Sequence, residues 1–276
     1  MCLIVFSWQP DAATPLVLLA NRDEFFERPA EPMHWWSDRP EVLAGRDLRG
    51  GGTWMGIHRD GRFAALTNFR DGRAPMAPKG TPSRGLLVSA MLDATSFDDD
   101  LTRIEKHAHE YAGFNLLAGD LPAGKLYWLG NRDTNGSRAS ASWPVAHPVT
   151  PVTPGYHGLS NALLDTPWPK LVSRRHALRD ALENTADDLT LLTIMRDANE
   201  AADDTLPETG VTREWEKTLS AAFIASPAYG TRCTTLLRYH RDGMVEVTES
   251  TVSPAQPSHE LRDLRHFRFE IGSAER

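Results

Sequence analysis

The sequence begins MCLIVFSW at residues 1–8 and continues, after a short turn, with PLVLLANRDE at residues 15–24. Each stretch contains an apolar run of the length typical of a buried strand. The pattern predicts a hairpin of two strands, Cys2–Trp8 and Pro15–Ala20. In such a hairpin, the Asn-Arg-Asp-Glu segment that ends the second strand lies next to Cys2 at the start of the first.

Turn dipeptides and alternating apolar residues predict further hairpins downstream. Asp60-Gly61 and Asp242-Gly243 are the expected two-residue turns. The strands expected from this pattern are 53–58, 62–68, 113–118, 125–129, 231–239, 244–249 and 266–271. Runs of adjacent hairpins are typical of antiparallel sheets, whose apolar faces helices can cover. The sequence therefore predicts an α+β fold.

Helical periodicity appears in two separate blocks of the chain. The first block starts near Ser83 and continues, in a more polar form, through Ile104. The second opens at Thr166 and Pro167, which are expected to be the N-cap and the first residue of the clearest helix. Two shorter helices are expected at 189–195 and 213–224. Two blocks of helices fit two sheets that lie between two helix layers.

The bulk composition is that of an ordinary globular chain. Its 276 residues show no repeat and no long linker, which favours one domain over 1–276 with a surface loop at 137–154. No apolar run of about 18 residues and no secretory n-region is present, which favours a cytoplasmic protein without a transmembrane segment. The net charge of −7 argues against a nucleic-acid partner. Two cysteines offer no zinc spacing, so no metal is expected.

Cys2 is the first candidate for chemistry. If Met1 is removed, as the small cysteine side chain permits, the chain begins with a thiol beside its own free amine. An α-amine titrates near ~7.7–8.0 and can therefore accept the thiol proton at working pH. Thiol and base then come from one residue, which suits covalent acyl transfer. The alternative interpretation is that Cys2 is a small apolar residue in a first strand.

The charged segment beside Cys2 supports the chemical interpretation. A guanidinium at Arg22 favours the thiolate, and a nearby carboxylate keeps the new amine oriented. Asp23 and Glu24 are both candidates for this carboxylate. The alternative is a charged turn after a strand, which is the usual role of such a cluster.

Three further polar residues are candidates for the same site. Asn68 and Asn161 carry amides that can donate to a developing oxyanion, although asparagine at a strand end is more often a turn residue. Arg232 lies at the start of an otherwise apolar strand. A buried arginine there needs a carboxylate partner, which Asp23 or Glu24 would supply.

The Asn-Arg-Asp-Glu segment after an N-terminal Met-Cys resembles the signature of the NRDE family, also called the transport-and-Golgi-organisation-two family. Three other segments resemble later motifs of that family, and together the four span most of the chain in order. They are GGGTWMG at 50–56, LSNALLDTPWPK at 159–170 and YGTR at 229–232.

The resemblance implies a four-layer αββα sandwich of two antiparallel sheets, similar to the N-terminal-nucleophile hydrolases, choloylglycine hydrolases and penicillin V acylases. It implies the following roles: Cys2 as nucleophile, Arg22 and Asp23 as its polar neighbours, Asn68 and Asn161 as oxyanion or amine partners, and Arg232 as a site arginine. The implied reaction is cysteine-dependent hydrolysis of a linear, non-peptide amide or another acyl bond. That hydrolysis requires no cofactor.

The same family is associated with haem trafficking, and its eukaryotic relatives with lipid and acyl-coenzyme A metabolism. The alternative expectation is therefore a carrier of haem or acyl lipid that uses the cleft without catalysis. Haem would be a transient, non-covalent ligand, because no Cys-x-x-Cys-His motif is present. The candidates for its ligands are His34, His58 and Cys2, and those for the cleft walls are Trp35, Trp36 and Trp54. Both hypotheses predict a small-molecule ligand, and neither specifies an oligomeric state.

Overall fold

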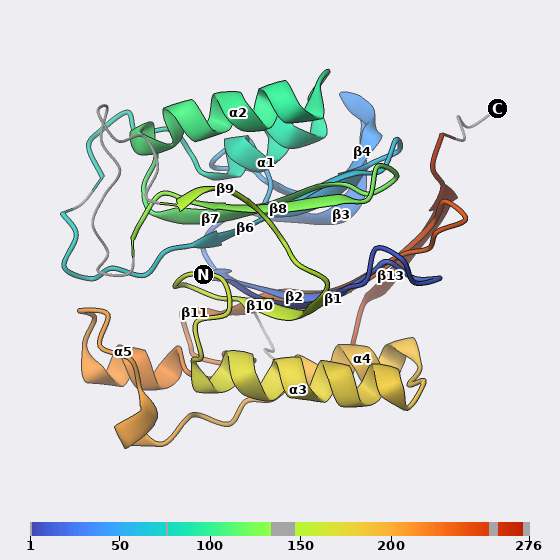
Figure 1. Cartoon of the computed structure of the whole chain (residues 1–276). Coiled ribbons are helices and arrows are strands. Elements are labelled where there is room, and N and C mark those ends of the chain that lie inside the picture. Colours follow the sequence, from blue (N-terminus) through green and yellow to red (C-terminus); the bar gives the residue numbers. More distant parts are fainter. Residues whose placement is uncertain (1, 76, 134–146, 254–258, 273–276) are drawn as a thin grey trace.

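A computed structural model describes residues 2–75, 77–133, 147–253 and 259–272. Its strands form two antiparallel sheets, stacked face to face between two layers of helices (Figure 1). This arrangement confirms the four-layer αββα fold. The sheets have the orders β10-β1-β2-β11-β12-β13 and β3-β4-β5-β6-β7-β8-β9.

The first sheet contains both ends of the described chain. Its strands are β10 (Gly155–Leu159), β1 (Cys2–Trp8), β2 (Leu16–Phe25), β11 (Tyr229–Tyr239), β12 (Met244–Thr251) and β13 (Leu264–Glu270). The predicted hairpin of β1 and β2 is confirmed, but β2 extends to Phe25. The charged segment therefore lies inside a strand and not after it, because β11 pairs with β2 as far as Phe25.

The second sheet is built from consecutive antiparallel strands. They are β3 (Ala30–Trp36), β4 (Arg39–Asp47), β5 (Met55–His58), β6 (Arg62–Asn68), β7 (Phe114–Asp120), β8 (Lys125–Gly130) and β9 (His147–Pro151). The hairpins β5–β6 and β7–β8 follow the prediction. β9 lies within the loop predicted at 137–154, and residues 137–146 of that prediction lie outside the described residues.

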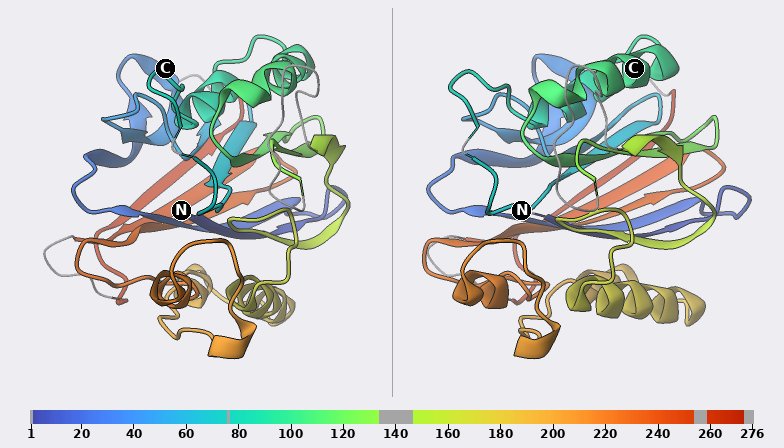
Figure 2. Two further views of the ribbon diagram at one scale, coloured as in Figure 1. Left: turned by 90° about the vertical axis from the view of Figure 1, so that its left-hand side faces the viewer. Right: turned by 60° about the vertical axis from the view of Figure 1, so that its left-hand side comes forward.

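Helices cover the outer face of each sheet (Figure 2). Two helices, α1 (Gly85–Leu92) and α2 (Phe97–His107), lie on the second sheet. The first sheet is covered on its outer face, below β1 and β11 in Figure 1, by α3 (Pro169–Glu183), α4 (Asp188–Ile194) and α5 (Arg213–Thr218). Short 3₁₀ turns occur at Ala108–Glu110 and Asp203–Thr205. No described helix is long and apolar enough to cross a membrane.

Two of the predicted helix boundaries are wrong. The clearest helix starts at Pro169, with Trp168 as its N-cap, because Trp168 is still extended at φ −67° and ψ 143°. Thr166 and Pro167 therefore precede the helix. The helix predicted over 213–224 ends at Thr218, after which the chain turns into the core.

Alternation along the central strands divides the core into layers. Ile4 and Phe6 of β1 point between the sheets, whereas Leu3 and Val5 point toward the helices below. Because the side-chain period of a strand is two, Cys2 shares the face of Ile4 and opens between the sheets. The strand thus orients the thiol before any polar contact is made.

Asn21 anchors β2 to the helix layer at the point where the charged segment begins. Its Nδ2 donates to the carbonyl oxygens of Met195 and Ala222, both at 2.8 Å, and its Oδ1 accepts from Thr234 Oγ1 at 2.7 Å. Asn21 is 1% exposed. If the Asn21 side chain is removed, solvent therefore does not reach the groups that were bonded to it.

We expect Asn21→Ala to lower the free energy of unfolding by roughly 1–3 kcal/mol, because it leaves buried polar groups unsatisfied. Thr234→Val removes one of the three bonds and should cost less. Urea denaturation of both variants measures the difference. Equal stability of Asn21→Ala and the wild type would show that this anchor contributes nothing.

Candidate functional site

Cys2 and Arg22 are direct neighbours across the β1–β2 ladder. Side chains directly opposite each other in an antiparallel pair lie on the same face of the sheet. Both therefore point between the two sheets, where they line a common pocket of about 520 Å³. Cys2 is half-buried and Arg22 is 6% exposed. The structure thus brings the two leading candidates together at one end of the sandwich.

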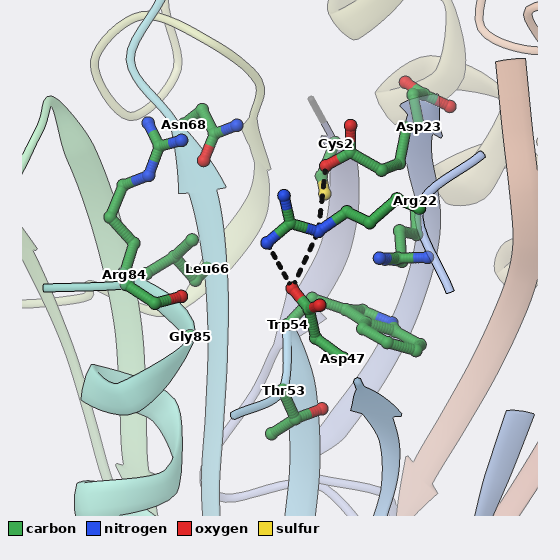
Figure 3. Close-up of a pocket in the computed structure, with 13 residues that line it drawn as sticks. Cys2, Arg22, Asp23, Asp47, Thr53, Trp54, Leu66, Asn68, Arg84 and Gly85 are labelled. Carbon is green, nitrogen blue, oxygen red and sulfur yellow. Dashed lines mark hydrogen bonds and ion pairs between the residues drawn. The ribbon is translucent and has the colours of Figure 1, made fainter. Parts of the chain in front are cut away.

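The other wall of this pocket comes from the second sheet and from α1. Asn68 ends β6, Trp54 precedes β5, and Arg84 directly precedes α1 (Figure 3). The Arg22 guanidinium lies over the Trp54 ring, 4.1 Å from its centroid. Asn68, predicted from its place at a strand end, is therefore in the same pocket as Cys2.

The environment of Cys2 favours a neutral thiol in the resting protein. Burial raises the pKa of the Cys2 thiol, and the Asp23 carboxylate acts in the same direction. The positive charge of Arg22 and the backbone N–H of Asp23 lower the pKa. A thiol in this setting needs a base before it can act as a nucleophile.

Asp23 and Glu24 occupy different surroundings. Asp23 is 1% exposed, and its Oδ1 accepts a hydrogen bond from Thr231 Oγ1 at 2.8 Å. Burial raises the pKa of the Asp23 carboxyl, while the charge of Lys170 lowers it. Glu24 is more exposed and lies 3.8 Å from the Arg28 guanidinium, which also binds Asp47. Asp23 is thus the buried carboxylate, and Glu24 belongs to an ion-pair cluster at the rim.

Lys170 is a component of the site that the sequence did not reveal. It is 5% exposed at the start of α3, and its Nζ donates to the Leu219 carbonyl at 2.8 Å. Burial lowers the pKa of Lys170 to about 8, against the attraction of Asp23. The charge of Lys170 thus favours the ionised form of the Asp23 carboxyl, against the larger effect of burial. The signal in the sequence was a lysine at the second position of the helix, inside the 159–170 motif.

Asn161 and Asn68 are joined by a hydrogen bond, but only Asn68 lines the pocket of Cys2. Asn161 is fully buried, and its Nδ2 donates to the backbone oxygen of Asn68 at 2.9 Å. The backbone N–H of Arg70 donates to the backbone oxygen of Asn161 at 2.7 Å. The Arg70 guanidinium forms a buried ion pair with Glu216, also at 2.7 Å. Asn68 therefore lines the pocket, while Asn161 fixes the strand end that carries it.

Arg232 has different partners from those expected. Its Nη1 donates to the backbone oxygens of Phe25 and Arg28, at 2.9 and 3.0 Å, and not to Asp23 or Glu24. The reason is a β-bulge at Arg232, which shifts the register between Thr231 and Cys233. Arg232 lines a second pocket, which shares Arg22 and Trp54 with the first.

The residues suggested for a haem cleft are dispersed. Trp54 lines both pockets, whereas Trp36 is buried in the core under α1 and α2. Trp35 packs on Phe269, and His34 bonds to the Pro32 carbonyl through Nδ1 at 2.8 Å. His58 is paired with Asp60 at 2.8 Å. Within the described ranges, no group of three metal-ligating side chains occurs.

The chain is similar to known proteins in sequence and in fold. A family model described as Transport and Golgi organisation 2 matches residues 1–254. The Transport and Golgi organization protein 2 homolog of Bos taurus is 35% identical over 98% of this chain and 100% of its own length. The Homo sapiens homolog is 32% identical over 99% and 100%. The solved Caenorhabditis elegans N-acylethanolamine-hydrolyzing acid amidase ortholog shares the fold, with a TM-score of 0.50 at 8% identity over 86% of this chain and 92% of that one.

Proposed function

Since this chain belongs to the Transport and Golgi organisation 2 family and has an N-terminal-nucleophile hydrolase-like fold, we propose that it hydrolyses a linear amide or a related acyl bond through Cys2. The observation that carries the proposal is the placement of Cys2 opposite Arg22 on one wall of a polar pocket, with Asn68 among the residues of the facing wall. Nucleophile, cation and amide donor then surround one cavity.

The reaction follows from the groups in this cavity. Removal of Met1 gives Cys2 a free α-amine, which takes the thiol proton as the sulfur bonds to the substrate carbonyl carbon. The intermediate expels the leaving nitrogen, which receives that proton as the C–N bond breaks. Water then gives a proton to the same amine, attacks the thioester and releases the carboxylic acid, and the thiol is restored. No oxidant or cofactor enters this balance.

The polar side chains act on charge that develops during these steps. Asn68 is our candidate donor to the oxyanion, and such a donor is typically worth roughly 2.7–4 kcal/mol. Arg22 stabilises the thiolate, and Asp23, whose negative charge Lys170 favours, orients the ammonium form of the amine. Asn161 acts as a positioning residue through the Asn68 backbone.

The two cysteines are expected to differ in reactivity. Cys2 is half-buried and lines the pocket, whereas Cys233 is 4% exposed, and burial raises the pKa of its thiol well above the usual value. We expect iodoacetamide to modify Cys2 at least ~10-fold faster than Cys233, because thiolate fraction and access govern the rate. Peptide mass mapping over time measures both rates. Faster modification of Cys233 would contradict the assignment of the open pocket to Cys2.

A panel of acyl donors tests the proposed function. N-acyl amides, thioesters and esters of graded chain length are incubated with the protein, and an acyl adduct on the Cys2 peptide is sought by mass spectrometry. Hydrolysis with a Cys2 adduct supports the proposal. Ligand binding that persists in Cys2→Ala, without turnover of any donor by the wild type, favours the carrier role instead.

A further inference from the structure

A second pocket, of about 620 Å³, adjoins the first on the far side of Arg22 and Trp54. It lies where the row of side chains that starts at Cys2 continues across the sheet, because Cys233 pairs with Arg22 and Thr251 pairs with Cys233. Arg22 and Trp54 line both pockets, so the Arg22 guanidinium borders the Cys2 cavity and the second cavity alike. The residues that line this second pocket include Arg22, Trp54, Arg232, Cys233, Glu249 and Thr251.

Arg22 is a buried cation without a protein anion. It is 6% exposed, and its guanidinium forms no hydrogen bond or ion pair with any residue that the structure describes. The guanidinium lies against the face of the Trp54 ring. Buried arginines are ordinarily paired, so the guanidinium is open to an acceptor that the protein does not provide.

Arg232 adds a second guanidinium to the same pocket. Its Nη1 is held by the Phe25 and Arg28 carbonyls, and within the described chain it forms no ion pair with a carboxylate. Burial lowers the pKa of Arg232, and the charge of Arg22 lowers it further, which places the two cations within electrostatic reach of each other. Two like charges facing one cavity attract an anion between them.

The acidic groups around the pocket do not neutralise this pair. Glu31 and Asp263 lie exposed at the rim. Glu249 is fully buried, its Oε1 accepts from the Met33 N–H at 2.7 Å, and burial raises the pKa of its carboxyl. Thr251 contributes a hydroxyl whose buried Oγ1 has no hydrogen-bond partner among the described residues. The pocket thus offers two cations and an unused hydroxyl.

We propose that this second pocket is an anion subsite, which binds a carboxylate or phosphate group between Arg22 and Arg232 with Thr251 as an additional donor. This subsite rests on the proposed function. The substrates are then acyl donors that carry a carboxylate or phosphate group a short distance from the scissile carbonyl. Guanidinium pairs recognise such groups through charge-assisted hydrogen bonds, which are stronger than neutral ones.

Titration calorimetry on the full-length Cys2→Ala protein tests the subsite without catalysis. The probes are butyrate, the isosteric neutral butyramide, and inorganic phosphate. Arg232→Gln and Thr251→Val are added on the same background. Arg241→Gln is the matched control, because Arg241 also donates to backbone oxygens and loses the same charge, but lies at the β11–β12 turn. Thermal unfolding of each variant checks that it folds. If Arg232→Gln does not fold, Thr251→Val still tests the subsite, because valine has nearly the volume of threonine and should not disturb the packing.

We expect butyrate or phosphate to bind at least ~10-fold more tightly than butyramide, with Arg232→Gln removing most of that preference and Thr251→Val weakening it several-fold. A preference for butyrate identifies a carboxylate site, and a preference for phosphate identifies a phosphate site. Equal binding of butyrate, phosphate and butyramide, or anion binding unchanged in Thr251→Val and Arg232→Gln, would overturn the subsite. Such a result would not bear on the proposed hydrolysis through Cys2. Anion binding without any acyl turnover by the wild type would instead contradict the hydrolase function and support the subsite.

Discussion

Replacement of Cys2 by alanine is expected to lower the hydrolysis of any acyl donor that the wild type cleaves by at least ~10³-fold, since it removes the only covalent route to the products. The fold should survive, because Cys2 is half-buried at the first position of β1 and its side chain is small. The residual rate then reports what Arg22 and Asn68 contribute without a nucleophile. Steady-state kinetics on the best donor of the acyl panel measures the loss.

Cys233→Ala is the matched control for this variant. Cys233 lies two strands away from Cys2 on the same face of the sheet and is buried beside Glu249. Its removal deletes one thiol from the neighbouring pocket but leaves the Cys2 pocket intact, so activity should stay within a few-fold of wild type. Comparable activity of Cys2→Ala and the wild type, or a larger loss in Cys233→Ala, would contradict the assignment of the nucleophile.

Glu216→Ala is expected to lower the free energy of unfolding by about 3–5 kcal/mol, because it removes the carboxylate that forms a buried ion pair with Arg70. The two side chains are 3% and 2% exposed and lie 2.7 Å apart. Glu216 also accepts from Thr209 through its backbone N–H and its hydroxyl. The same substitution should reduce acyl turnover, since Arg70 holds the Asn161–Asn68 connection.

Glu214→Ala provides the comparison within the same helix, because Glu214 is exposed two residues earlier in α5. Its loss should change stability by no more than about 0.5 kcal/mol. Chemical denaturation of both variants gives the two values. A cost below about 1 kcal/mol for Glu216→Ala would mean that the buried pair does not support the site.

The parts of the fold that the sequence predicts are those in which alternation and turn chemistry agree. The β5–β6 and β11–β12 hairpins carry Asp-Gly turns, and both form. β3 and β4 were not predicted, because register shifts between Glu31 and His34 and between Trp35 and Trp36 disrupt the two-residue period. β10 is too short and polar to stand out, and it forms because β1 offers it an edge.

The candidate site also has a part that the sequence predicts and a part that it does not. The proximity of Cys2 and Arg22 follows from a local hairpin and could be predicted. The neighbours Lys170, Arg70 and Trp54 approach only when helix and sheet layers stack, and no local pattern encodes that stacking. Arg232 was assigned the wrong partners for a related reason, since a bulge in β11 turns its guanidinium toward backbone carbonyls.

Whether Cys2 can supply both nucleophile and base is measured by the intact mass of untagged protein made in a bacterial cytoplasm. We expect the mass of a chain that starts at Cys2, whose α-amine is then free to accept the thiol proton. A mass that includes Met1 would contradict it, because the Cys2 nitrogen would be held in a peptide bond and have no basicity to contribute.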